Sequence, residues 1–358
     1  MTPEMRYLLD LNGYLHLRGA LSPRELHACR AAADRYVALC AAVERAGAGA
    51  SVPEGFGNGA KPGHPGGRGY SNGYAWEKPL EQLLFHRRVW PIVLELTDGR
   101  PGLSTGTMIV DDAALGQAHQ QGSHLHCARE DVEGIVNPGR SPSNVAPFEG
   151  SCYCQRDPNS DRIRSDNFVV FPYLDSVAEG EGGLVVLPGS HKSKFNRPAH
   201  LFGRFGLDAH RQSQQSRDTG NGWQAIPSSP PAVGASPELG VHSLVANLTP
   251  EAGDILIMPE ATCHGVLPWR GLGRRRIFSL RFHAQHGDLR DYRAKKGVQA
   301  VGDFPRYMRE KWSPETLELL LGAEEGHTKA IARREVIELA PFDTLYPPLP
   351  PPGGRSRL

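Results

Sequence analysis

The chain has 358 residues, 39% of them hydrophobic, and its 40 basic and 39 acidic residues leave a formal net charge of +1. This content is enough to fill a core, while the balanced charge argues against a general nucleic-acid-binding protein. No apolar run predicts a transmembrane helix, and the N-terminal segment lacks the apolar core of a signal peptide. Because the six cysteines also lack the paired spacing of a secreted framework, we expect a cytoplasmic protein without a membrane partner.

The first hundred residues predict helices. Ser22 followed by Pro23 is typical of a helix start, with Ser22 as the N-cap, and alanine-rich apolar spacing predicts a helix that continues to about Ala48. The Gly/Pro-rich stretch over 55–69 predicts a surface loop, and the apolar spacing over 81–97 predicts a second helix. We expect both helices to pack outside a sheet and to support it.

Farther along the chain, apolar segments and turns predict β-strands. Residues 168–175 form one such segment, and residues 181–192 combine a turn, a short apolar strand and a Pro-Gly-Ser-His-Lys stop. An Ala-Gly-Asp turn over 252–254 precedes a further apolar strand that reaches Met258. His264 follows at the edge of another strand, and after one more turn Arg275 begins the next.

His264 and Arg275 are the candidate site residues. Imidazole is a good ligand for iron(II), and guanidinium offers a planar two-pronged fork to a carboxylate. In a strand, Ser279 shares a face with Arg275, so both could bind one carboxylate. The pair suggests a metal enzyme with a carboxylate co-substrate. The alternative is a half-buried strand whose arginines face solvent, beside a histidine whose hydrogen bonds are merely satisfied.

Taken in this order, these segments resemble the phytanoyl-CoA dioxygenase family, which belongs to the iron(II)- and 2-oxoglutarate-dependent oxygenases. The resemblance covers most of the chain, from an opening strand and helix over 12–26 to Arg275. It implies a mainly β fold with flanking helices, a double-stranded β-helix or cupin-like jelly-roll barrel. It also implies Fe(II), 2-oxoglutarate, molecular oxygen and a small-molecule substrate. His264 would be the distal metal histidine, Arg275 the clamp for the far carboxylate of 2-oxoglutarate, and Ser279 its helper.

The proximal part of the metal site departs from the family pattern. Family members with ordinary hydroxylase chemistry carry His-x-Asp here, which supplies two of three ligands in a facial 2-His-1-carboxylate triad. In this chain His126 is followed two positions later by Ala128, and His124 by His126. The resemblance favours His126 over His124 as the second metal histidine. The source of the third ligand stays open among Glu260, Glu130, Asp131, a halide and water.

These alternatives imply different chemistry. A carboxylate from elsewhere in the chain favours a hydroxylase, whereas a vacancy at Ala128 resembles the iron halogenases, in which chloride takes the open position. A third hypothesis is a catalytically silent barrel that binds a small molecule or a protein partner. Zinc hydrolysis on a cupin-like barrel would leave Arg275 unexplained.

Single barrels with insertions reach this length, so we predict one elaborated domain over residues 1–343 and a Pro/Gly-rich tail over 344–358. An insertion near 193–249 would interrupt the barrel strands. Two interpretations of it stay open: a lid over the open end that selects substrate, or a disordered surface excursion.

Overall fold

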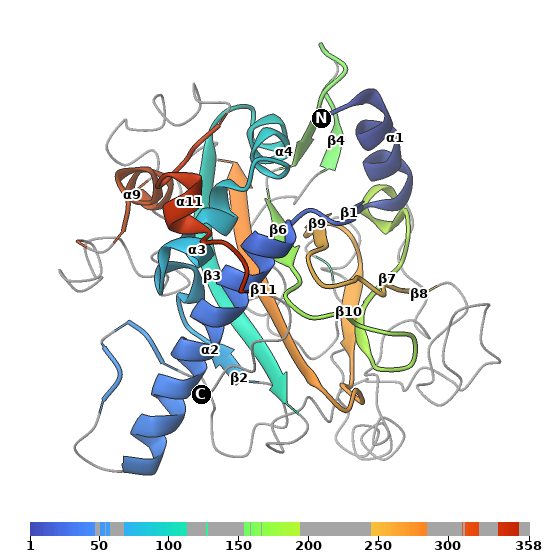
Figure 1. Ribbon diagram of the computed structural model, residues 1–358. Helices are drawn as coiled ribbons and strands as arrows, with labels where there is room; N and C mark the ends of the chain where they lie inside the picture. The colour runs from blue at the N-terminus through green and yellow to red at the C-terminus, as the bar shows by residue number, and fades with distance from the viewer. Residues whose placement is uncertain are drawn as a thin grey trace, which may run out of the picture.

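Antiparallel strands and the helices packed against them make up the structure, a computed structural model (Figure 1). It describes residues 1–46, 51–53, 55–57, 68–112, 127, 154–157, 159–165, 167–193, 245–284, 310, 312–321 and 336–350. Several residues and segments that were singled out in the sequence lie outside this part: His124, His126, Ala128, Glu130, Asp131, most of the loop over 55–69, and residues 194–244 of the insertion.

The larger sheet has six strands, all paired antiparallel. Their order is β1 (Leu15–Leu17), β9 (Ile255–Pro259), β6 (Asn167–Pro172), β11 (Arg274–Ala284), β3 (Pro101–Asp112) and β2 (Arg68–Tyr70). The strands predicted near 168–175 and 255–258 are confirmed as β6 and β9, which lie next to each other. Strand β11 carries Arg275 and runs between β6 and β3.

The smaller sheet has the order β10 (His264–Leu267), β7 (Gly183–Val186) and β8 (Ala246–Asn247). A separate pair joins β4 (Cys154–Arg156) to β5 (Ile163–Ser165). The predicted succession of His264 on one strand, a turn, and Arg275 on the next is confirmed. Among the described residues no strand joins the two larger sheets, so this part of the chain forms an open sandwich and not the closed barrel expected from the sequence.

Two layers of apolar side chains lie on the opposite faces of the larger sheet. One layer lies between the two sheets and combines Val169, Met258 and Ile277 with Leu184 and Val186 of the smaller sheet. The other packs against the helices and includes Phe168, Val170, Ile257, Phe278 and Leu280. Neighbouring residues of β6, β9 and β11 thus alternate between the layers, as the period-two geometry of a strand requires. The surface that lines the space between the sheets is called the inner face below.

The helices cover the outer layer, and Figure 1 shows α2 (Pro23–Ala46) crossing the larger sheet. The described part of the chain also contains α1 (Pro3–Asn12), η1 (Gly73–Ala75), α3 (Lys78–Glu81), η2 (Gln82–Phe85), α4 (Trp90–Leu96), η5 (Ser190–Lys192), α9 (Pro314–Leu321) and α11 (Phe342–Leu345). The predicted N-cap is confirmed as a capping box: the N–H of Glu25 donates to Ser22 Oγ, and the N–H of Ser22 to Glu25 Oε2.

The single helix predicted over 81–97 is wrong, because the segment divides into α3, η2 and α4. His86 ends η2 with extended backbone angles, φ −52° and ψ 129°. Pro91 then lies in the first turn of α4. Proline is tolerated there, but inside a helix it would remove a hydrogen bond and clash with the preceding turn. Most apolar residues of the segment are buried in η2 and α4, yet the proline requires a new helix start.

The Ala-Gly-Asp turn that precedes β9 is held by one carboxylate. Asp254 Oδ1 accepts from the N–H of Gly19 at 2.7 Å, and Oδ2 accepts from the N–H of Glu251 at 2.9 Å. Oδ2 also lies 2.6 Å from Nε2 of His16 on β1. The carboxylate of Asp254 therefore links the edge strand β1, and the turn after it, to the turn that precedes β9.

The C-terminal part packs against the helical layer. Glu81 Oε1 accepts from Ser313 N and from Thr316 Oγ1, both at 2.7 Å, and so docks α9 against α3. The tail predicted from residue 344 begins inside α11, where Leu345 and Tyr346 are buried against Ala28 of α2. Within the described ranges, no helix is both long and apolar enough to cross a membrane.

Candidate functional site

His264 begins β10 and lies on the inner face. Its register partner is Val186, and it alternates in phase with Val266, both of which contact the layer between the sheets. The residue is 3% exposed, and Nδ1 lies 2.7 Å from the carbonyl oxygen of Thr262. Because a carbonyl oxygen can only accept, Nδ1 carries the proton, and in the neutral ring Nε2 then presents a lone pair. A carbonyl partner on one ring nitrogen is the usual support of a metal-binding histidine.

The segment that leads into His264 is fixed by three contacts. Thr262 Oγ1 donates to the carbonyl of Gly13 at 2.7 Å. The N–H of Cys263 donates to Ser190 Oγ at 2.7 Å, and the carbonyl of Cys263 accepts from the N–H of Leu187 at 2.8 Å. The Pro-Gly-Ser-His-Lys motif noted in the sequence thus has a structural role, because its serine holds the residue just before His264.

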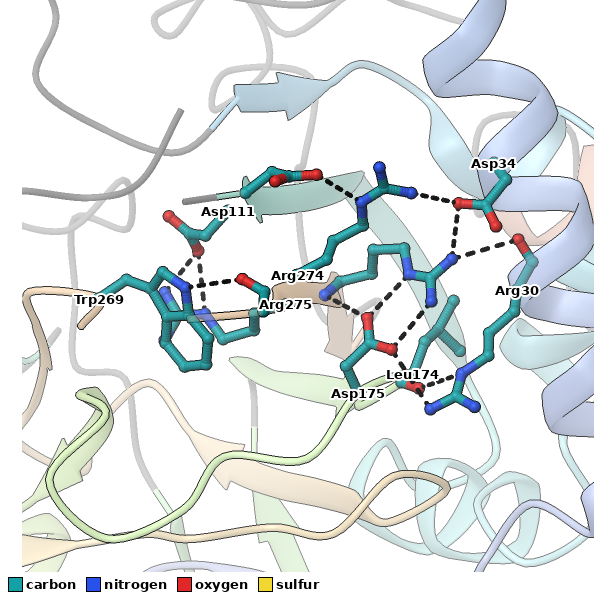
Figure 2. A network of polar contacts seen from close by, with 11 residues as sticks. Arg30, Asp34, Asp111, Leu174, Asp175, Trp269, Arg274 and Arg275 are labelled. Carbon is teal, nitrogen blue, oxygen red and sulfur yellow. Dashed lines mark hydrogen bonds and ion pairs between the residues drawn. The ribbon is translucent and has the colours of Figure 1, made fainter. Parts of the chain in front are cut away.

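Arg275 lies on the inner face of the larger sheet, and its side chain is only 2% exposed. Strand register places it directly opposite Asp111 of β3. Both Nε and Nη2 donate to the same oxygen, Asp111 Oδ2, at 2.9 and 2.6 Å. The ring of Trp269 stacks on the guanidinium, whose central carbon is 4.7 Å from the ring centroid (Figure 2). The cation is therefore buried, paired and covered.

Other groups complete the surroundings of Arg275. Gly183 lies close to Nη1, since a Cβ placed on this glycine would be 3.6 Å from that nitrogen. Tyr173 is fully buried next to β11, and burial raises the pKa of its phenol to about 12, although the charge of Arg275 acts in the opposite direction. The phenol is thus neutral at physiological pH. Of these described neighbours of Arg275, only Asp111 carries a charge.

The two neighbours of Arg275 point to the opposite side of the sheet. Arg274 donates to Asp112 and to Asp34 on α2, at 2.7 and 2.8 Å. Arg276 donates to Asp34 at 2.7 Å and grips both oxygens of Asp175 at 2.8 and 2.9 Å. Figure 2 shows this network extending toward α2, away from Trp269. Strand geometry thus divides the three consecutive arginines, and only the middle one faces the inner side.

Ser279 shares the inner face with Arg275 and is half-buried, in register with Thr107. Farther along β11, Arg281 forms an ion pair with Glu260, whose side chain is 6% exposed. Glu260 follows directly after β9, and its N–H donates to the carbonyl of Asn167. A metal ion would therefore compete with Arg281 for the carboxylate of Glu260.

A complete metal site is not present within the described residues, where no group of three or more His, Cys, Asp or Glu side chains converges. His264, Arg275 and Ser279 are placed on the two facing inner surfaces of the sandwich. His126 and the candidate carboxylates Glu130 and Asp131 lie outside the described ranges.

Asp111 and Trp269 were not assigned a role from the sequence. A weak signal for Asp111 was available, because it ends a strand-like segment in phase with Ile109, which contacts the inner layer. Its pairing with Arg275 spans 164 positions and depends on the register of two distant strands. Trp269 belongs to a Leu-Pro-Trp element visible in the sequence, but its place over a cation follows only from the turn between β10 and β11.

Comparisons with known proteins show that this chain is similar to solved structures in its fold. No family model and no curated protein matches the sequence. HygX from Streptomyces hygroscopicus with nickel and 2-oxoglutarate bound is 15% identical with a TM-score of 0.52, covering 80% of this chain and 88% of that one. HygX with hygromycin B also bound is 16% identical with a TM-score of 0.51 over the same shares. The 2-oxoglutarate-dependent epimerase SnoN from nogalamycin biosynthesis is 14% identical, with a TM-score of 0.45 over 78% of this chain and 82% of that one.

At these identities the likeness to HygX establishes the fold alone. The antiparallel sheets, the flanking helices and this likeness together support the predicted jelly-roll architecture. Membership of the phytanoyl-CoA dioxygenase family stays a prediction, as do the roles of the individual site residues.

Proposed function

We propose that the protein is an iron(II)- and 2-oxoglutarate-dependent oxygenase that hydroxylates a small molecule with molecular oxygen. The observation that carries this proposal is the placement of His264 and Arg275 on facing inner surfaces of a sandwich with the fold of HygX. HygX is described with nickel, 2-oxoglutarate and hygromycin B. From that likeness we take the kind of metal, the co-substrate and a small-molecule substrate for this chain.

The described residues fit a metal ion at His264. The hydrogen bond from Nδ1 to Thr262 directs the Nε2 lone pair away from the backbone, and burial limits competition by water. We propose His126 as the second histidine. Because Glu260 is already paired with Arg281, Glu130 or Asp131 is the better carboxylate candidate, with a halide or water as the alternatives at the position of Ala128.

The described residues also fit a dicarboxylate at Arg275. Arginine is the side chain best suited to a buried carboxylate, because its planar fork donates two parallel hydrogen bonds. Trp269 shields one side of the guanidinium from solvent, which strengthens its interaction with an anion. Ser279, on the same face, would donate a further hydrogen bond to the far carboxylate of 2-oxoglutarate.

When bound, the metal and 2-oxoglutarate supply the oxidising chemistry, in which 2-oxoglutarate loses carbon dioxide and becomes succinate. The protein's own contribution is orientation and the exclusion of water. His264 is held in one tautomer, Arg275 in one place, and the apolar layer between the sheets keeps the surroundings dry.

Anaerobic reconstitution tests the proposal. Purified protein is mixed with iron(II) and 2-oxoglutarate, and the weak metal-to-ligand charge-transfer band is followed in the visible range. We expect the band in the wild type and its loss in His264→Ala and His126→Ala. His27→Ala is the matched control, because His27 is exposed on α2 and lies far from the inner face.

The outcome separates the alternatives. A band that is lost in both site variants, followed by succinate formation in air, supports an oxygenase, and products formed with and without chloride distinguish hydroxylation from halogenation. Absence of the band in folded wild-type protein would contradict the proposal and favour the catalytically silent binding barrel.

A further inference from the structure

We infer that Asp111 is an internal competitor for the carboxylate site on Arg275, and that it thereby sets the affinity for the co-substrate. The inference rests on the proposed function, because it concerns the same dicarboxylate site. Asp111 is 0% exposed, lies on the inner face, and places its carboxylate against the guanidinium that an incoming carboxylate would need.

Three described neighbours surround the guanidinium of Arg275, and one of them is itself an anion. Asp111 takes the edge formed by Nε and Nη2, with both nitrogens donating to one oxygen. Trp269 covers the plane of the guanidinium, and Gly183 of β7 lies close to Nη1. Of these three neighbours, only Asp111 has the charge and shape of the ligand. An incoming carboxylate therefore displaces Asp111 or shares the cation with it.

Either arrangement costs binding free energy. Displacement breaks a buried ion pair and leaves the carboxylate of Asp111 without this cation, which is costly in a low-dielectric interior. Sharing places two carboxylates against one guanidinium, where like charges repel. Asparagine at position 111 keeps the size and one accepting oxygen but removes the negative charge. The loss of that charge should strengthen the binding of a dicarboxylate.

A purely supporting role for Asp111 predicts the opposite sign. If the carboxylate only holds the guanidinium in place, its loss would let Arg275 move and would weaken ligand binding. The sign of the change in affinity therefore decides between competition and positioning.

The test uses glutarate, which has two carboxylates but no keto group to chelate a metal. Its affinity for the metal-free protein is measured by isothermal titration calorimetry, and the thermal shift that it causes is measured in parallel. We expect Asp111→Asn to bind glutarate about tenfold more tightly than the wild type, as expected for removal of one nearby like charge. The shift in unfolding temperature with glutarate should also be larger in the variant.

Asp112→Asn is the matched control. Asp112 is the next residue in the chain and also pairs with an arginine, but on the outer face with Arg274. Its substitution should leave the glutarate affinity unchanged. Unchanged or weaker glutarate binding by Asp111→Asn would overturn the inference.

Asp111→Ser provides a second variant should Asp111→Asn fail to fold. It too is expected to bind glutarate more tightly than the wild type. If neither variant folds even with glutarate present, Asp111 is a structural partner of Arg275 and the inference fails. Failure of the proposed function gives a different result. Asp111→Asn would then bind glutarate more tightly while the wild type forms no complex with iron(II) and 2-oxoglutarate. That result would support a dicarboxylate site in a protein that is not an oxygenase.

Discussion

The carbonyl oxygen of Thr262 lies 2.7 Å from Nδ1 of His264, only two residues along the chain. This contact fixes the tautomer of the imidazole, since a carbonyl has no proton to give. The contacts of Thr262 with Gly13, and of Cys263 with Ser190, hold this short segment from two other parts of the chain. The position of the candidate metal ligand therefore depends on residues that would not contact a metal themselves.

Ser190→Ala tests this dependence. The substitution removes the hydroxyl that accepts from the Cys263 N–H, and we expect a loss of about 1 kcal/mol in the free energy of unfolding, together with weaker iron(II) binding. Ser176→Ala is the control, because Ser176 Oγ accepts a similar backbone bond, from Ala252, in an exposed turn. Urea unfolding and iron titration give the two readouts. Equal effects of the two substitutions on iron binding would argue against a link from Ser190 to His264.

Gly13→Ala should be more damaging. A Cβ at this position would lie 2.5 Å from His191 Nδ1 and 2.8 Å from Thr262 Oγ1, and the backbone φ of +77° is already unfavourable for alanine. Gly19→Ala is closely matched, since Gly19 has a φ of +50° and a Cβ there would meet nothing within 4 Å. We expect Gly13→Ala to cost roughly 1–3 kcal/mol more than Gly19→Ala, because crowding adds to the backbone strain. Thermal unfolding of both variants measures the difference, and equal losses would contradict the crowded contact.

The sequence predicted the parts of the fold that depend on local periodicity. The shared face of Arg275 and Ser279 was visible because every second residue of a strand points to the same side. The N-cap at Ser22 was visible because serine followed by proline is typical of a helix start, whereas the reciprocal bond from the Ser22 N–H to Glu25 was not predicted. The turn before β9 and the end of β7 were visible for similar reasons, since Gly-Asp and Pro-Gly elements mark turns.

What the sequence did not predict depends on distant pairing. The burial of Arg275 against Asp111 follows from the register of β11 and β3, and the pairing of Glu260 with Arg281 follows from two strands on either side of β6. Neither pairing leaves a local pattern. The break at His86 was missed for another reason: the buried spacing on both sides of it is compatible with one helix, and only Pro91 opposes it.

The ion pair between Arg275 and Asp111 also changes what is expected from Arg275→Ala. The substitution removes the proposed clamp, so 2-oxoglutarate binding should fall by several-fold or more. It also leaves the buried carboxylate of Asp111 without this cation, which should cost roughly 3–5 kcal/mol in unfolding free energy. Arg275→Met combined with Asp111→Leu should be less destabilised, because no uncompensated charge stays buried, yet it should still bind no 2-oxoglutarate.

Arg274→Ala is the control for this pair of experiments. Arg274 is more exposed and binds Asp112 and Asp34 on the outer face, so we expect a loss below about 1 kcal/mol and normal ligand affinity. Chemical unfolding measures the change in stability, and calorimetric titration measures the change in affinity for 2-oxoglutarate. If the double variant is less stable than Arg275→Ala, the uncompensated charge of Asp111 is not the source of the instability of Arg275→Ala.

Acid stability should depend on Glu25, the partner of Ser22 in the capping box. Burial alone would raise the pKa of Glu25, but the contacts with His86 and the hydrogen bond from the Ser22 N–H outweigh it and lower the pKa to about 2, from an ordinary value of 4.5. A carboxylate with a lowered pKa stabilises the fold fully above its ordinary pKa, and this stabilisation is lost as pH falls toward the folded value. The loss should therefore occur between about pH 4.5 and pH 2, with a total on the order of 3 kcal/mol. Glu25→Gln should flatten the fall in unfolding free energy across that range, measured by urea unfolding at successive pH values. Glu4→Gln, on the exposed side of α1, should leave the fall as steep as in the wild type, and an equally steep fall in Glu25→Gln would exclude Glu25 as its source.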